Sequence, residues 1–116
     1  TILEEFDVIC GIPYGALPLA VYIATKYNKK LIYIRSEKKD YGTQKLIEGE
    51  YSKNDRCVII DDVLTTGKSI EKDYTVLKDL VTIVDKAVVV NRSQNYAIKS
   101  LIDKKDLDKY FKEKCN

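Results

Sequence analysis

The amino-acid sequence predicts an α/β domain in which a mainly parallel sheet is flanked by helices. Short apolar runs, rich in β-branched residues and bounded by charge, have the length and composition of buried parallel strands: Phe6–Cys10, Leu31–Ile34, Cys57–Ile60 and Lys86–Val90. Two stretches with helical spacing each connect two of these runs, which is the alternation of βαβ units. A length of 116 residues with 45% hydrophobic content suits one domain over residues 1–116.

The first predicted βαβ unit begins with Phe6–Cys10, and the glycines and proline of Gly11–Gly15 then predict a loop. A helix is expected from Leu17, and Asn28 is a plausible residue for its C-terminal stop. The apolar residues that keep helical spacing along it are Ala20, Val21, Ala24 and Tyr27. The strand Leu31–Ile34 completes the unit.

The segment Arg35–Asp55 separates the two predicted units and is dense in charge and glycine. It offers little apolar material before Leu46 and Ile47, so we expect a flexible charged loop. The alternative is an exposed hairpin with solvated charges, which is the usual meaning of a charged stretch.

The second predicted unit contains Cys57–Ile60, which we expect to end at Asp61-Asp62, and a helix near Ser69–Val81. On that helix one stripe consists of Ile70, Tyr74, Leu77 and Val81. The strand Lys86–Val90 follows and is expected to end at Asn91-Arg92. The tail predicts a short strand near 97–102, Asp103 as N-cap, and an amphipathic helix whose inward residues are Leu107, Tyr110 and Phe111.

Composition excludes several classes of function. The chain has no histidine, and its three cysteines lack C-x-x-C spacing, which argues against the usual zinc sites, Ser-His triads and Cys-His pairs. Cys10 and Cys57 lie in apolar runs and are interpreted as structural thiols. The formal charge of +2, without basic clusters, gives no sign of nucleic-acid or membrane binding, and no signal peptide or membrane span is visible, so we expect a cytoplasmic protein.

The chemistry-bearing stretch follows the strand Cys57–Ile60. Carboxylates at the C-terminal end of a parallel strand lie where open sheets bind ligands, and Asp61 with Asp62 could bind a vicinal diol such as a ribose. A turn into the next helix then offers hydroxyls, a glycine and backbone N–H groups for a phosphate: Thr65, Thr66, Gly67, Lys68 and Ser69. The alternative is simple helix capping. A Walker A loop is excluded because Asp62 stands where its first glycine is required.

This stretch resembles the phosphoribosyl pyrophosphate (PRPP) motif of type I phosphoribosyltransferases, and four matching segments narrow the resemblance to orotate phosphoribosyltransferases. Phe6–Ala20 resembles that family's pyrophosphate loop, where the backbone amides of Tyr14 and Gly15 would meet the diphosphate. Arg35–Thr43 resembles the mobile catalytic loop, whose Arg35 and Lys39 would meet the pyrophosphate, often in the neighbouring subunit of a dimer.

Several positions depart from the family pattern. Ser36 stands where bacterial members commonly have lysine, whereas Asp-Tyr-Gly-Thr around Tyr41 resembles the eukaryotic form. Asn91-Arg92 occupies the place of an Asp-Arg pair whose arginine contacts the orotate carboxylate, and the usual glycine-rich continuation is missing. The resemblance implies an orotate site that includes Thr65 and Arg92.

The resemblance implies a pentosyltransferase of pyrimidine biosynthesis: orotate and PRPP give orotidine 5′-monophosphate and pyrophosphate, with Mg²⁺ carried mainly by the diphosphate. Catalytic roles fall to Lys39, Asp61 and Asp62, and a homodimer that shares the mobile loop is expected. The alternatives are another phosphoribosyltransferase, such as a purine-type enzyme, and a non-catalytic PRPP-binding or regulatory module.

The chain begins at what would be mid-domain in the family, so the segment that helps hold orotate is expected to be missing. Either the sequence is a fragment of a longer enzyme, such as the transferase half of a uridine monophosphate synthase, or it is a reduced protein. We therefore expect PRPP binding, weak orotate binding and little turnover.

Overall fold

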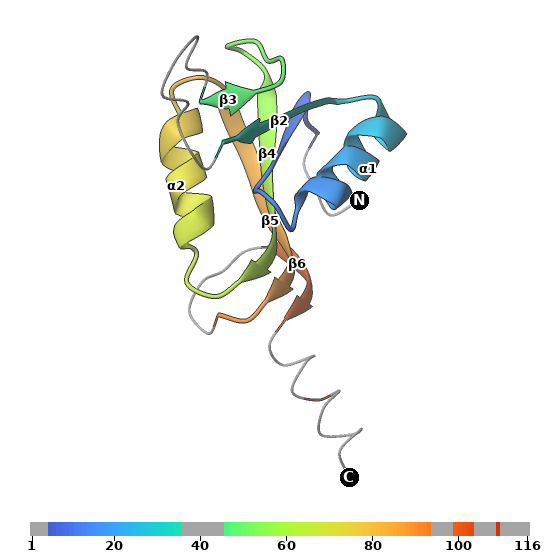
Figure 1. Ribbon diagram of the computed structural model, residues 1–116, viewed down its shortest axis with the longest axis vertical. Helices are drawn as coiled ribbons and strands as arrows, with labels where there is room; N and C mark the ends of the chain where they lie inside the picture. Colours follow the sequence, from blue (N-terminus) through green and yellow to red (C-terminus); the bar gives the residue numbers. More distant parts are fainter. Residues whose placement is uncertain (1–4, 36–45, 94–98, 104–108, 110–116) are drawn as a thin grey trace.

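The computed structural model describes residues 5–35, 46–93, 99–103 and 109. Its elements follow in the order β1 (Val8–Gly11), α1 (Leu17–Tyr27), β2 (Lys30–Ile34), β3 (Ile47–Glu48), β4 (Arg56–Leu64), α2 (Lys68–Leu77), β5 (Thr82–Asn91) and β6 (Lys99–Asp103). Figure 1 shows α1 and α2 on opposite faces of one twisted sheet. The predicted α/β architecture is confirmed.

The sheet has the strand order β3-β2-β1-β4-β5-β6, and all neighbouring pairs are parallel except β2 with β3. From β1 the chain passes through α1 to β2 on one side, whereas β4 lies on the other side of β1 and leads through α2 to β5. Right-handed crossovers that run in opposite directions place their helices on opposite faces. The carboxyl ends of β1 and β4 therefore flank a topological switch point, the usual ligand position in such sheets.

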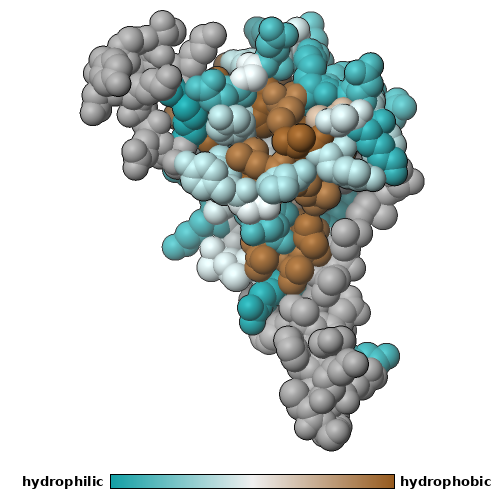
Figure 2. Space-filling view, turned by 45° about the vertical axis from the view of Figure 1, so that its right-hand side comes forward, coloured by the Kyte–Doolittle hydropathy of each residue, from teal (hydrophilic) through white to brown (hydrophobic). Residues whose placement is uncertain are grey.

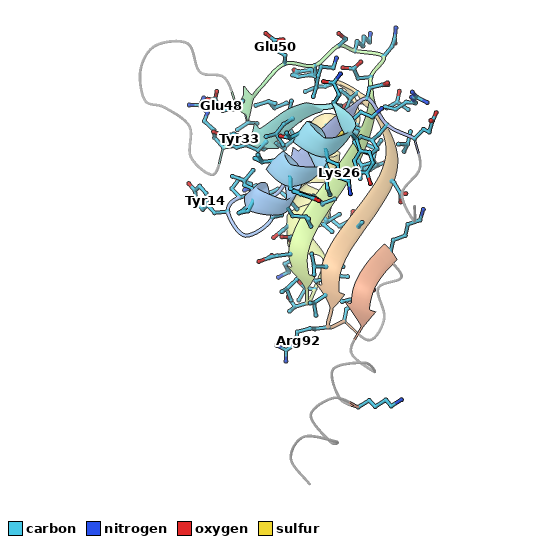
Figure 3. The ribbon with its side chains drawn as sticks, turned by 90° about the vertical axis from the view of Figure 1, so that its right-hand side faces the viewer. Tyr14, Lys26, Tyr33, Glu48, Glu50 and Arg92 are labelled. Carbon is cyan, nitrogen blue, oxygen red and sulfur yellow. The ribbon has the colours of Figure 1, made fainter. Side chains whose placement is uncertain are left out.

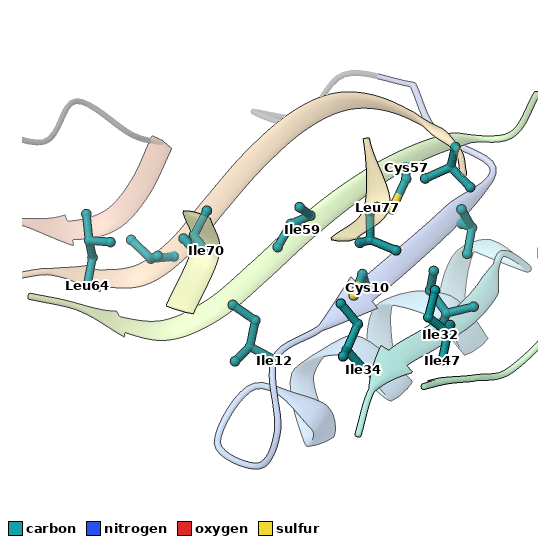
Figure 4. Packing of buried hydrophobic residues seen from close by; sticks show 13 residues of the cluster. Cys10, Ile12, Ile32, Ile34, Ile47, Cys57, Ile59, Leu64, Ile70 and Leu77 are labelled. Carbon is teal, nitrogen blue, oxygen red and sulfur yellow. The ribbon is translucent and has the colours of Figure 1, made fainter. Parts of the chain in front are cut away.

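Each face of the sheet packs against one helix. The core on the α2 face is built mainly from aliphatic side chains, and Figure 4 shows Ile59 of β4 between Cys10 and Leu77 on one side and Ile70 on the other. The core on the α1 face uses the small residues Ala16, Ala20 and Ala24. Small residues let this helix lie close to the sheet, because a Cβ at Gly11 would already be 2.8 Å from the Ala20 Cβ.

The strands are longer than the apolar runs that predicted them. β4 continues to Leu64, and its pairing with β5 reaches Leu64 and Asn91. The expectation that this strand ends at Asp61-Asp62 was wrong, because the backbone ladder with β5 continues where the side chains become polar. Both acids are therefore held by a strand.

The helices follow the prediction with two corrections. α1 begins at Leu17, and Asn28 ends it in the left-handed conformation with φ 54°. Its Val21 and Tyr27 are each 47% exposed, so the predicted stripe was wrong for these two residues. α2 ends at Leu77, four residues before Val81, which nevertheless lies in the core.

The charged segment is not a single loop. Residues 46–55 are part of the packed structure: Ile47 is buried, and β3 pairs antiparallel with β2. The expectation of a flexible charged loop was therefore wrong for residues 46–55, while residues 36–45 lie outside the described part of the chain.

In the tail, β6 pairs parallel with β5 and confirms a strand close to the predicted position. Asp103, expected as an N-cap, is the last residue of β6. Leu107, Tyr110 and Phe111, which were expected on a helix, lie outside the described residues. In the parts that can be described, no helix has the length and apolar character needed to cross a membrane.

Candidate active site

The two adjacent acids lie in the second half of β4 and differ in exposure. Asp61 is buried with 9% exposure, whereas Asp62 is exposed. Asp61 Oδ1 accepts a hydrogen bond from the Asp62 amide at 2.8 Å, and Asp62 Oδ1 accepts one from the Val63 amide at 2.8 Å. Each carboxylate is thus oriented by the backbone, while its second oxygen is not used in either bond. Two fixed acceptors side by side suit the adjacent hydroxyls of a ribose.

Burial is the main influence on the charge of Asp61. It raises the pKa of this carboxyl from 3.8 to about 6, and the neighbouring Asp62 adds to the shift. Taking a carboxylate out of water disfavours its charged form, as does a second acid nearby. Asp61 is therefore still mainly ionised at neutral pH, but it binds a proton more readily than an aspartate in water does.

The loop Gly11–Gly15 brings a second segment to these acids. Its start is fixed to β4, because the Ile12 amide donates to the Ile60 carbonyl at 3.0 Å. A Cβ at Gly15 would lie only 2.0 Å from Asp62 Oδ2, so this glycine lets the loop backbone lie directly against the carboxylate. Tyr14 projects from the same loop and is 74% exposed. Residues nearly fifty positions apart thus meet at the switch point predicted by the topology.

The hydroxyl-rich turn connects the end of β4 to α2. Thr65, Thr66, Lys68 and Ser69 are exposed, and Gly67 is buried with φ 81°, a left-handed conformation that glycine adopts without strain. The Lys68 amide lies 3.4 Å from Thr66 Oγ1, a long contact for a hydrogen bond. The first-turn amides and the positive end of the α2 dipole thus lie beside exposed hydroxyl groups, an arrangement that suits a phosphate.

Arg92 follows β5 at the same edge of the sheet. Its amide donates to the Leu64 carbonyl at 2.7 Å, so its backbone lies beside the residue that precedes Thr65. Figure 3 shows Arg92 at the carboxyl end of β5 and Tyr14 on the loop before α1. The backbones of Thr65 and Arg92, which were predicted to share an orotate site, thus lie close together.

Arg35 is the described residue of the predicted mobile catalytic loop Arg35–Thr43. It follows β2, and its Nε lies 3.1 Å from Glu48 Oε1 on β3. Its amide also donates to the Leu46 carbonyl at 2.8 Å, which joins the two ends of segment 36–45. The backbone of Arg35 is thus tied to Leu46, while its guanidinium lies beside Glu48 of β3. Lys39, predicted as its catalytic partner, lies outside the described residues.

Comparison with known proteins decides the family. The family model for the phosphoribosyl transferase domain matches residues 2–111. The chain belongs to this family. This confirms the resemblance drawn from the motif around Asp61 and Asp62.

The relatives of this phosphoribosyltransferase domain include orotate phosphoribosyltransferases and uridine 5′-monophosphate synthases. The orotate phosphoribosyltransferase of Methanothermobacter thermautotrophicus is 44% identical over 91 residues, covering 78% of this chain and 51% of that protein. The uridine 5′-monophosphate synthase of Bos taurus is 43% identical over 91 residues, covering 78% of this chain and 19% of that protein. The orotate phosphoribosyltransferase structure from Aeropyrum pernix aligns with a TM-score of 0.75 at 32% identity, covering 91% of this chain and 66% of that one. The chain thus spans about half the length, or less, of the curated relatives it matches.

Sequence reasoning missed a buried acid in the phosphoribosyltransferase domain. Asp73 of α2 is 5% exposed and faces β1, where Cys10 Sγ lies 3.8 Å from its Oδ2. Burial raises the pKa of Asp73 to about 6. The signal was present in the sequence, since position 73 falls between Ile70 and Leu77 on the predicted stripe.

The structure also has a surface hollow that lies away from the predicted site. A hollow of about 340 Å³ is lined by Lys30, Gly49, Glu50, Tyr51 and Ser52. Figure 3 places Glu50 at the end of the molecule opposite Arg92, so this hollow is separate from the predicted site. Within the described residues, no group of three or more acids and cysteines gathers as a metal site.

Proposed function

We propose that this chain carries the PRPP-binding chemistry of an orotate phosphoribosyltransferase, which converts orotate and PRPP into orotidine 5′-monophosphate and pyrophosphate. The observation that carries the proposal is the meeting of Gly15 and Asp62 at the switch point, next to the hydroxyl turn of Thr65–Ser69. Support comes from the relatives of this chain, several of which are orotate phosphoribosyltransferases.

The arrangement suggests a role for each segment. Asp61 and Asp62 hold the ribose hydroxyls, Thr65, Thr66, Gly67, Lys68 and Ser69 bind the 5′-phosphate, and the amides of Tyr14 and Gly15 bind the diphosphate. Glycosyl transfer passes through a sugar with oxocarbenium character, so the nearby carboxylates also stabilise developing positive charge. Lys39, with Arg35, would neutralise the departing pyrophosphate. For Arg35 this requires release from Glu48, 3.1 Å away.

The carboxylate of Asp62 is a possible ligand for Mg²⁺. The exposed carboxylate of Asp62 fits the preference of this ion for oxygen, but one of its oxygens is bonded to the Val63 amide. Asp62 could therefore supply at most part of an octahedral set, and the substrate diphosphate would hold the ion. Bound there, the ion would neutralise charge on the leaving group.

Arg92 and Thr65 are proposed to contact the base, with the arginine on the orotate carboxylate. An arginine suits this task because its planar donors match a carboxylate. Among the ion pairs of the described residues, none involves Arg92. The guanidinium of Arg92 thus provides a positive charge where the anionic base would lie.

We further propose that residues 1–116 form one domain of a cytoplasmic homodimer in which the mobile loop is shared. The α1 face offers a surface for assembly: Figure 2 shows apolar residues gathered on it, and Val21, Tyr22 and Tyr27 of α1 are exposed. Sedimentation equilibrium of the wild-type chain and of Val21→Glu tests the dimer, since a charge on an apolar interface should shift the chain to monomer.

The activity is tested by measuring pyrophosphate release when Mg²⁺, PRPP and orotate are mixed with the chain. Release that requires orotate supports the proposal, and release with a purine base instead supports the purine-type alternative. PRPP binding without release with any base would fit either a non-catalytic PRPP-binding module or a chain without the segment that helps hold orotate, and the same assay on a chain extended upstream of Thr1 distinguishes the two. No binding of PRPP would contradict the proposed site itself.

A further inference from the structure

The backbone just after β5 is held by a side chain, that of Asn91. Asn91 is buried with 9% exposure, and its Oδ1 accepts hydrogen bonds from the Ser93 amide at 2.9 Å and the Ser93 hydroxyl at 2.7 Å. A side-chain oxygen bonded to the amide two residues on defines an Asx turn. Arg92 is the residue at the apex of this turn, and it is exposed while Asn91 is buried.

The turn is anchored where the base would lie. Asn91 is paired in register with Leu64, and the Arg92 amide donates to the Leu64 carbonyl at 2.7 Å. The backbone of Arg92 is therefore held on both sides, by the ladder to β4 before it and by the Asx turn after it. Figure 3 shows its side chain leaving the carboxyl end of β5.

We propose that Asn91, with Ser93, is a positioning residue that presents Arg92 to the carboxylate of the base. The inference rests on the proposed function. Long arginine side chains lose rotamer freedom on binding, so a fixed backbone beneath the side chain reduces the cost of each contact. The turn needs an acceptor oxygen rather than a charge, which both asparagine and aspartate provide. The amide at this position therefore serves where the family resemblance has an acid.

Orotidine 5′-monophosphate and uridine 5′-monophosphate form the matched probe pair, because they differ only in the base carboxylate. The ratio of their dissociation constants, measured by calorimetry, reports the Arg92 contact alone. We expect Asn91→Ala to reduce this ratio by roughly threefold to tenfold, the value of about one hydrogen bond, through the orotidine 5′-monophosphate constant only. Asn91→Asp should restore the ratio, and Ser93→Ala should lower it less because the Ser93 amide still donates.

Hydrogen exchange of the Ser93 amide provides a second readout that needs no ligand. This amide should be protected in the wild-type chain and in Asn91→Asp, and it should exchange faster in Asn91→Ala. Thermal unfolding of each variant identifies loss of folding, in which case Ser93→Ala carries the test.

Four outcomes would contradict one part of this reasoning or another. A ratio near one in the wild-type chain, unchanged in Arg92→Ala, contradicts the proposed base contact rather than the positioning role. An unchanged ratio in Asn91→Ala when Arg92→Ala lowers it overturns the inference. Equal damage by Asn91→Ala and Asn91→Asp, or equal weakening of both nucleotides, also overturns it.

Discussion

Replacing Asp73 by asparagine should stabilise the domain at neutral pH. Asp73 of α2 is buried against β1, where its carboxylate accepts a hydrogen bond from the Cys10 thiol at a sulfur–oxygen distance of 3.8 Å. Thiols are weak donors, so the ionised carboxylate loses more hydration than it regains. Asparagine has nearly the same shape and no charge to bury.

The magnitude follows from the raised pKa of Asp73, about 6 against an ordinary 3.8. Because the folded state binds the proton more tightly, the free energy of unfolding falls as the pH rises from about 4, and the loss is complete above about 6. A shift of this size corresponds to at most about 3 kcal/mol. Screening by solvent reduces the expected gain from Asp73→Asn to about 1–2 kcal/mol.

Urea unfolding at pH 4 and pH 7.5 measures this gain. We expect Asp73→Asn to be close to neutral at pH 4 and stabilising at pH 7.5. Asp79→Asn is the matched control, since Asp79 is exposed just after the same helix and should change little at either pH. A gain of equal size at both pH values, or a loss at pH 7.5, would refute the reasoning.

Two predictions concern the site. Gly15→Ala should leave the melting temperature nearly unchanged but weaken PRPP binding about threefold to tenfold. The added Cβ would lie 2.0 Å from Asp62 Oδ2 and would force this carboxylate to move. An unchanged affinity measured by calorimetry would contradict this prediction. Lys39→Ala should lower turnover much more than PRPP affinity, since a loop lysine engages fully only as charge develops on pyrophosphate, whereas Lys38→Ala should matter less. Equal effects of the two lysine variants on the rate would favour a charged loop without a catalytic role.

The sequence predicted the elements that leave a regular pattern of apolar residues along the chain. Apolar runs located β1, β2, β4 and β5, and helical spacing located α1 and α2. The order of strand, loop and helix placed Asp61 and Asp62 near the carboxyl end of the sheet. Gly67 lies in the turn that leads into α2, as predicted, and the structure shows that it adopts a left-handed conformation there.

What the sequence did not predict depends on tertiary contacts. Spacing alone could not tell that small alanines rather than Val21 and Tyr27 would face the sheet, because close packing at Gly11 favours the small side chains. Segment 46–55 looked mobile because a two-residue strand carries almost no pattern, yet Ile47 secures it in the core. The ion pair of Arg35 with Glu48 and the buried position of Asp73 likewise arise between segments distant in sequence.

The ribose assignment is tested most directly by titrating PRPP with Mg²⁺ into the wild-type chain and into Asp61→Asn with Asp62→Asn. Hydrogen bonds to charged groups contribute about 1.5–3 kcal/mol each, so losing both carboxylate charges should weaken binding by at least about a hundredfold. Circular dichroism and thermal unfolding would confirm that the double variant is folded. An unchanged PRPP affinity in a folded double variant would contradict the account that these two acids hold the ribose.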